Sequence, residues 1–385
     1  MARSLSWRRW LLVLAGLVVL VIAGRALFFG IRARAVHPDS AAIASVNGKV
    51  AAPQWTVAVE RSRQMIRARM TQQNVPGLSI AVGVGDEMAW SEGFGWADME
   101  SRSPVGAETR FRIGTASRLL TAAAVGVLVE RGKLKLDEPI QTYLPKYPKQ
   151  EKAVTLRQLM TSAGSTASVN DEDPLLRQRC EKAVDALQHL GTSDSKYGWV
   201  LVSAAVEAAA DLPFGKFLQE AVFQPSAMTN SGAESAKEEN PEGIGEEGED
   251  APPMTFVREV ILRPLGVVDP KAKLQSRQPA TMYVPGVGRG ALAPYGLRVM
   301  QPRDLSCFAG SMAYFSTPTD MARFAMAQTS KDLALDRDGE LLGQKLMSLR
   351  TVAERGIVVA VMANRSSADT AELAQKIAEA FAERK

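Results

Sequence analysis

The sequence predicts an α+β fold in which strands near the two ends of the domain enclose a helical middle. Residues 77–83 and 88–96 lie on either side of Gly85-Asp86 and have the composition of two strands joined by a hairpin turn. The unbroken apolar run 356–364 predicts a central strand. Residues 117–132 are nearly all apolar over the first three turns and predict a buried helix. We therefore expect the strands near the two ends of the domain to join in one sheet, with the buried helix packed against it.

Four further segments predict helices. The segment 55–70 is amphipathic, with its arginines gathered on one side. In the middle of the chain, residues 155–160 begin a short helix and residues 197–210 form a longer one. Residues 371–385 form the closing helix, so helices as well as strands are expected at both ends of the domain.

The N-terminus carries an apolar run, 10–31, that is interrupted only by Arg25. Its uninterrupted part, 10–24, is shorter than the ~20 residues of a spanning helix and is typical of a signal-peptide core. If Arg25 snorkels to the interface, the whole run can span the bilayer. Ala33-Arg34-Ala35 has the small-x-small form of a cleavage site, but arginines crowd it. We favour an uncleaved signal-anchor over a cleaved signal peptide, and both over a cytosolic location.

Composition divides the chain into three parts and one insertion. Residues 1–35 hold the signal-anchor or signal peptide, and 36–53 are small and polar and predict a linker. The remainder, 54–385, forms the folded domain. Within it, 231–253 carries eight acidic residues against one lysine, with several glycines and prolines. That composition predicts a flexible, solvated insertion at about 231–253.

The distribution of charge and the scarcity of metal-ligating residues argue against nucleic-acid binding and against a metal site. The chain has 385 residues and a net charge of +4, but six of its 46 basic residues precede the first acid, Asp39, which leaves 40 basic against 42 acidic residues. The excess of positive charge thus gives no argument for nucleic-acid binding. With only His37 and His189, and no ligand spacing around Cys180 or Cys307, we expect no metal and no cofactor. The cysteines allow one disulfide in an exported protein, although two buried free thiols are the slightly favoured interpretation.

Six segments resemble, in the same order, those of the serine beta-lactamase-like family of class C beta-lactamases, low-molecular-weight penicillin-binding proteins and related esterases. They are 76–82, 90–98, 111–114, 154–160, 197–199 and 304–320. The last resembles the branch that includes the mitochondrial lactamase-like protein. The resemblance covers about 55–385 and implies a serine beta-lactamase-like fold: an antiparallel sheet flanked by terminal helices, plus a helical subdomain. It also implies acyl transfer from beta-lactams, cell-wall peptides or esters to a serine.

The first motif of that family is Ser-x-x-Lys, in which the serine is acylated and the lysine helps to take its proton. The same four positions here read Thr115-Ala116-Ser117-Arg118. The methyl group of Thr115 crowds a close-packed oxyanion site. Arg118 cannot act as a base, because a guanidinium keeps its proton in a protein. We favour the interpretation that Thr115 caps the helix and Arg118 forms an ion pair.

The second motif is also altered. Where the family has Tyr-x-Asn or Tyr-Ser-x, this chain has Asp194-Ser195-Lys196, so that Asp194 takes the tyrosine position and Lys196 ends the motif. Residues 193–196 themselves read Ser-x-x-Lys, but roughly one such match is expected by chance at this chain's composition. A relocated nucleophile at Ser193 is therefore a minor alternative.

The third motif, Lys-Thr-Gly or His-x-Gly, lies in the family on a strand that lines the pocket and contacts the substrate carboxylate. No such sequence occurs between residues 316–320 and the strand at Gly356, and His189-Leu190-Gly191 comes too early in the chain. The short distance from Phe324 to Ile357 predicts that this strand is lost or replaced by residues 346–351.

These substitutions favour a degenerate family member with little or no acyl transfer. We expect it to be tethered to the membrane by its N-terminal helix and displayed on the periplasmic or another extracytoplasmic face. A weakly active esterase or peptidase is one alternative, and a membrane-anchored binding or scaffold module is another. The resemblance implies a cell-wall peptide or a small ester as the ligand.

Overall fold

The computed structural model describes residues 11–21, 24, 34–148, 153–162, 169, 172–190, 197–233, 279–286, 290–301, 303–328, 336–366 and 368–383. The strands are β1 (Ser45–Asn47), β2 (Gly77–Val84), β3 (Glu87–Asp98), β4 (Ser103–Pro104), β5 (Phe111–Arg112), β6 (Gly232–Ala233), β7 (Tyr283–Pro285), β8 (Leu297–Val299), β9 (Tyr314–Ser316), β10 (Arg337–Leu341), β11 (Gln344–Val352) and β12 (Ile357–Ala363). The α-helices are α2 (Thr56–Gln72), α3 (Ser117–Glu130), α4 (Leu156–Ser162), α5 (Gly198–Ala210), α6 (Phe214–Leu218), α9 (Pro318–Gln328) and α10 (Thr370–Ala382). The short 3-10 helices used below are η2 (Gly114–Ala116), η5 (Ala183–His189), η9 (Gly290–Tyr295) and η10 (Ser306–Phe308), and a π-helix, η7 (Gln219–Phe223), follows α6.

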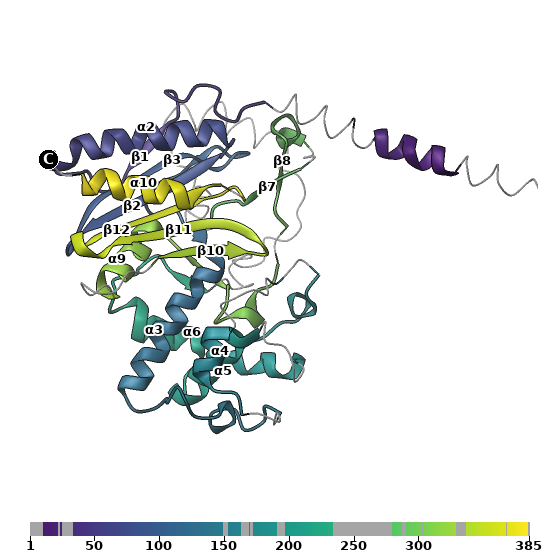
Figure 1. Ribbon diagram of the computed structural model, residues 1–385, viewed down its shortest axis with the longest axis vertical. Helices are drawn as coiled ribbons and strands as arrows, with labels where there is room; N and C mark the ends of the chain where they lie inside the picture. The colour runs from purple at the N-terminus through teal and green to yellow at the C-terminus, as the bar shows by residue number, and fades with distance from the viewer. Residues whose placement is uncertain are drawn as a thin grey trace, which may run out of the picture.

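A seven-stranded antiparallel sheet joins the two ends of the domain (Figure 1). Its strand order is β1-β3-β2-β12-β11-β10, with β4 paired to β3. The hairpin β2–β3 meets β12 directly, with Val361 opposite Ile80. The prediction that 77–83, 88–96 and 356–364 are strands is therefore confirmed, and so is the α+β fold.

Helices cover both faces of the sheet. Val359 and Val361 of β12 belong to the core that includes residues of α2 and α10. Their neighbours Val358 and Ala360 face the opposite way and belong to the core shared with α3 and α9. Because a strand buried on both faces has no solvent side, β12 reads as a continuous apolar run.

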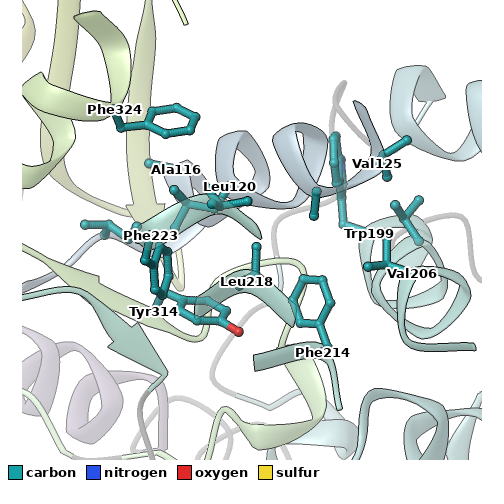
Figure 2. Close-up of a cluster of buried hydrophobic side chains, with 14 of the residues drawn as sticks. Ala116, Leu120, Val125, Trp199, Val206, Phe214, Leu218, Phe223, Tyr314 and Phe324 are labelled. Carbon is teal, nitrogen blue, oxygen red and sulfur yellow. The ribbon is translucent and has the colours of Figure 1, made fainter. Parts of the chain in front are cut away.

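The helical middle packs against the second face of the sheet. The first turns of α3 and nearly all of α5 are buried, and the side chains of these helices meet those of α6 and η7 (Figure 2). The labelled members of this core are Ala116, Leu120, Val125, Trp199, Val206, Phe214, Leu218, Phe223, Tyr314 and Phe324. The apolar composition of 117–132 and 197–210 therefore reflects a shared core.

The strand expected to be missing is present. Residues 346–351 lie within β11, and a separate strand, β10, pairs with it and forms one edge of the sheet. The expectation that an element was lost or replaced by 346–351 is therefore wrong. A two-residue turn at Leu342-Gly343, with both φ angles positive, makes the β10–β11 connection short enough for the available chain.

The segment 36–53 differs from the expected linker. Ile43 is buried, and β1 within this segment pairs with β3. The imidazole of His37 is buried as well and donates from Nε2 to the Pro76 carbonyl over 2.9 Å. The described domain thus includes part of the chain that its small and polar composition assigned to a linker.

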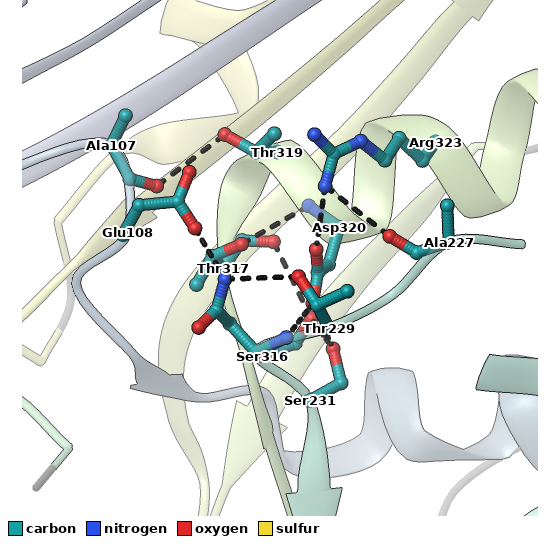
Figure 3. A network of polar contacts seen from close by, with 11 residues as sticks. Ala107, Glu108, Ala227, Thr229, Ser231, Ser316, Thr317, Thr319, Asp320 and Arg323 are labelled. Atoms are coloured by element: carbon teal, nitrogen blue, oxygen red, sulfur yellow. Dashed lines mark hydrogen bonds and ion pairs between the residues drawn. The ribbon is translucent and has the colours of Figure 1, made fainter. Parts of the chain in front are cut away.

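The start of the expected acidic insertion is also ordered into the domain. Gly232 and Ala233 pair with β9, and Ser231 Oγ donates to the carboxylate of Asp320 over 2.8 Å. That carboxylate, in the first turn of α9, also accepts from the backbone N–H of Asn230 and pairs with Arg323 one turn further along the helix (Figure 3). Residues 234–253 lie outside the described residues.

Cys180 and Cys307 form a disulfide with a Cα–Cα distance of 4.9 Å, so the interpretation as two free thiols is wrong. The bond joins the loop before η5 to η10 across 127 positions. Within the apolar N-terminal run, residues 11–21 are helical with exposed side chains. Among the described residues, no helix has both the length and the apolar character needed to cross a membrane.

Candidate active site

Thr115 lies in a tight turn between a short strand and the buried helix α3. Strand β5 pairs with β9, and the turn η2 follows it immediately. Gly114 has a φ of +52°, and a Cβ there would lie 2.1 Å from the Glu340 carbonyl oxygen. Glycine is required at this position for both reasons, because other residues resist positive φ and would clash with the neighbouring strand. The local sequence therefore places Thr115 at the start of α3 and against β10.

Strand β10 approaches this turn through its backbone. A Cβ on Gly339 would lie 2.3 Å from the Ile113 carbonyl oxygen, so this position also needs a glycine. The pairing of β10 with β11 shifts register between Gly339 and Glu340. Such a bulge redirects the backbone groups beside it. Here the Glu340 N–H donates to Thr115 Oγ1 over 3.0 Å. An oxyanion donor in acyl transfer points at the carbonyl oxygen of the substrate, so in this structure the Glu340 N–H serves the Thr115 hydroxyl instead.

Arg118 lies on the first turn of α3 and is partly buried. Burial lowers the pKa of its guanidinium, the nearby guanidinium of Arg337 lowers it further, and the Glu340 carboxylate raises it. Even so, an arginine side chain keeps its proton in proteins. Two positive groups, Arg118 and Arg337, therefore lie near each other, and neither can act as a base.

Arg337-Asp338-Gly339 was missed by the sequence analysis. It begins the edge strand β10, which lies against η2 and falls in the interval where the resemblance places the family's Lys-Thr-Gly or His-x-Gly strand. Its glycine makes the close approach described above, and its basic residue lies near Arg118. Asp338 turns to β11 instead, where it pairs with Arg350 and accepts from Ser348 Oγ. A search for a basic residue two positions before a glycine, ahead of the last two strands, would have found it.

Of the other predicted site residues, Asp194, Lys196 and Ser193 lie outside the described residues. Tyr197, which follows them, donates its hydroxyl to the buried carboxylate of Asp173 over 2.7 Å. The structure therefore brings Thr115 and Arg118 together with β10 and leaves the second motif untested. Within the described ranges, no group of three or more His, Cys, Asp or Glu side chains is placed to hold a metal ion.

A shallow hollow lies beside the end of β10. Two arginines, one amide and five apolar side chains line it: Arg112, Arg303, Gln301, Met282, Met300, Leu305, Leu341 and Leu342. Guanidinium groups bind carboxylates well, so this hollow offers a surface contact for an acidic group.

An antiparallel sheet with helices on both faces, and a turn that places a hydroxyl at the start of a buried helix beside an edge strand, define a serine beta-lactamase-like protein. The comparisons agree with this class. The family model described as Beta-lactamase matches residues 62–355, which is more than half of the chain. The chain belongs to the Beta-lactamase family.

Individual relatives match over shorter segments. The mitochondrial serine beta-lactamase-like protein LACTB of Mus musculus is 36% identical over 143 residues, covering 36% of this chain and 26% of that protein. A Beta-lactamase of Escherichia coli (strain K12) is 31% identical over 173 residues, covering 42% of this chain and 44% of that enzyme. The matched segment thus spans about a quarter of the first relative's length and less than half of the second's.

Solved structures show the same fold at low sequence identity. FmtA from Staphylococcus aureus has a TM-score of 0.59 and 16% identity, covering 88% of this chain and 94% of that chain. The octameric penicillin-binding protein homologue from Pyrococcus abyssi also has a TM-score of 0.59, with 17% identity, covering 85% of this chain and 78% of that one. At these identities the likeness concerns the fold alone.

Proposed function

We propose that this protein is a membrane-tethered member of the family that has lost acyl transfer at its former catalytic serine position. The observation that carries the proposal is Arg118, which stands where the family has a proton-accepting lysine and lies near a second guanidinium, that of Arg337. A threonine hydroxyl is a weak nucleophile until a base removes its proton. Arg118 and Arg337 are the basic residues of the first motif and of strand β10. Neither can remove this proton, because a guanidinium keeps its own.

The same site supports a second candidate, a weak acyl hydrolase that uses Thr115. Its supporting observation is the Glu340 N–H, which lies beside Thr115 Oγ1 and would have to donate instead to the carbonyl oxygen of a bound acyl group. Catalysis by this donor alone would be slow, because the donor and the base act as one unit. A third candidate, a module that binds a cell-wall peptide or a small ester, is supported by the hollow lined by Arg112 and Arg303.

The location that we propose is the periplasmic or another extracytoplasmic face of a membrane. The apolar N-terminal run supports the tether, since residues 11–21 are helical and expose their apolar side chains. The disulfide between Cys180 and Cys307 supports an oxidising compartment, because such bonds are rare where thiols are kept reduced.

Labelling with a fluorescent penicillin, followed by mass analysis of the intact protein, tests the central proposal. We expect no adduct with the natural chain, whereas a class C beta-lactamase treated in parallel should be labelled. An adduct that disappears in a Thr115→Ala variant would establish acylation at Thr115 and overturn the proposal. Turnover of short-chain esters would favour the hydrolase, and stabilisation by a cell-wall peptide without turnover would favour the binding module.

A further inference from the structure

The chain that leaves the N-terminal apolar run is fastened to the domain at its first described residues after that run. The Arg34 N–H donates to the Pro294 carbonyl over 2.6 Å, and the Val36 N–H donates to Asn74 Oδ1 over 2.6 Å. His37 follows, with its buried imidazole bound to the Pro76 carbonyl. The point at which the chain leaves the domain is thus held by three successive contacts.

These contacts place the exit point beside the two-stranded sheet β7–β8. Asn74, which has a φ of +54°, donates its side-chain amide to the Tyr295 carbonyl over 3.1 Å. Tyr295 ends η9, and β8 begins two residues later, at Leu297. Figure 1 shows β7 and β8 at one end of the molecule, with the lower end of α3 and the helical region at the other.

Chain length limits how far this end can lie from a membrane that holds the apolar run. Two residues, Arg32 and Ala33, lie between Ile31, the end of the run, and Arg34, which makes three Cα–Cα steps. Even when fully extended, three such steps span only about 11 Å. If residues 10–31 are inserted, Arg34 and the backbone of Pro294 must therefore lie within roughly that distance of the bilayer surface.

The two sequence segments that contribute described residues to this end are rich in basic residues. Residues 1–38 contain six arginines and no acidic residue, and residues 270–303 contain six basic and no acidic residues. Among the described ones, Arg34, Arg298 and Arg303 have exposed side chains, and Val299 between the last two is 38% exposed. Basic side chains close to a bilayer are attracted by anionic headgroups, and an exposed apolar side chain among them inserts favourably at the interface.

We propose that the β7–β8 sheet and the adjoining η9 lie against an anionic lipid surface, with Arg298 and Val299 at the contact and the helical region turned away from the membrane. This inference rests on the membrane tether of the proposed function. The contact orients the domain, so that the turn containing Thr115 is held in one direction relative to the membrane.

Depth-dependent quenching in the full-length protein tests this orientation. A Val299→Cys variant carries a thiol-reactive fluorophore in vesicles of equimolar phosphatidylcholine and phosphatidylglycerol, with nitroxide-labelled lipid as the quencher. The matched control is Lys133→Cys, an exposed position three residues after the end of α3. The native cysteines form a disulfide and do not react under non-reducing conditions. We expect strong quenching at position 299 and little at 133, and equal quenching at both positions overturns the inference.

Charge reversal tests the anionic component. Arg298→Glu in the labelled chain should reduce quenching at position 299, as should vesicles of phosphatidylcholine alone or high salt, whereas Lys133→Glu should leave it unchanged. Quenching that depends on none of these changes overturns the role of anionic lipid. Sedimentation of the vesicles separates the membrane tether from the orientation of the domain. Recovery of the natural chain in the supernatant contradicts the tether. Recovery in the pellet, with equal quenching at positions 299 and 133, contradicts only the orientation.

Discussion

The backbone N–H of Glu340 donates a hydrogen bond to the hydroxyl of Thr115, across 225 positions of the chain. This bond links the edge strand of the sheet to the turn that opens the buried helix. A backbone donor therefore lies beside the residue that the resemblance places at the family's serine position, and Arg118 stands where the family has its lysine. The proposed function is that the site has kept its framework and lost its proton chemistry.

Removing the hydroxyl should reduce stability. In a Thr115→Val variant the side chain keeps its shape, but the Glu340 N–H loses its acceptor. We expect the free energy of unfolding to fall by roughly 1–2 kcal/mol, measured by urea denaturation. Thr115→Ser keeps the oxygen and should lose less. Equal losses in the valine and serine variants would show that the hydrogen bond contributes nothing.

The contact between β10 and η2 predicts a large effect of one methyl group. Gly339→Ala places a Cβ 2.3 Å from the Ile113 carbonyl oxygen and should cost at least about 2 kcal/mol, because backbone atoms on both sides must shift. Gly126→Ala is the matched control in α3, where a Cβ meets nothing within 4 Å. That change should stabilise the helix by about 0.5–1 kcal/mol. Thermal unfolding of both variants compares the two effects, and similar melting temperatures would contradict the close approach.

Repairing the first motif alone should not restore chemistry. Thr115→Ser with Arg118→Lys supplies a serine and a side chain that can release a proton, but Asp194 still occupies the tyrosine position. Because catalytic groups act as a unit, we expect no turnover of a chromogenic cephalosporin. A quadruple variant that adds Asp194→Tyr and Lys196→Asn should form a penicillin adduct, since β10 already positions the Glu340 N–H. Saturable turnover by the double variant would mean that the second motif is dispensable.

His37 should make stability depend on pH. Burial lowers the pKa of its imidazole below the ordinary value, although hydrogen bonds to the backbone raise it. The unfolded chain takes up a proton near pH ~6.5 while the folded chain stays neutral, so this contribution to stability is complete above about pH 6.5 and is lost as the pH falls. The free energy of unfolding should therefore decrease more steeply between about pH 7 and 5 in the natural chain than in His37→Gln. His189→Gln, at an exposed position, should keep the steep decrease.

The disulfide should contribute substantially to stability. It closes a loop with a sequence separation of 127, and the loss of such a bond typically costs about 2–4 kcal/mol. Reductant should lower the melting temperature of the natural chain and leave that of a Cys180→Ala, Cys307→Ala variant unchanged. A thiol assay of the unfolded, unreduced chain should detect no free cysteine. Two reactive thiols in that assay would contradict the pairing.

Local patterns were sufficient for most of the framework. The apolar run 356–364 predicts a strand buried on both faces, and 117–132 predicts a helix buried in its first turns, because burial determines composition residue by residue. Both predictions agree with β12 and α3. The chemistry of Arg118 also follows from its identity, since a guanidinium keeps its proton wherever the fold places it.

Tertiary structure alone decided the remaining features. The residues of β10, Arg-Asp-Gly-Glu-Leu, lack the alternation that marks a strand, and they form one because they pair with β11 and meet the turn at Gly114. The pairing of Cys180 with Cys307 depends on a Cα–Cα distance that spacing along the chain does not reveal. The hydrogen bond between Glu340 and Thr115 likewise depends on tertiary packing, which brings β10 against the turn before α3. Contacts between distant segments are set by how the sheet and helices pack, so the sequence specified which groups the site contains, and packing specified which of them meet.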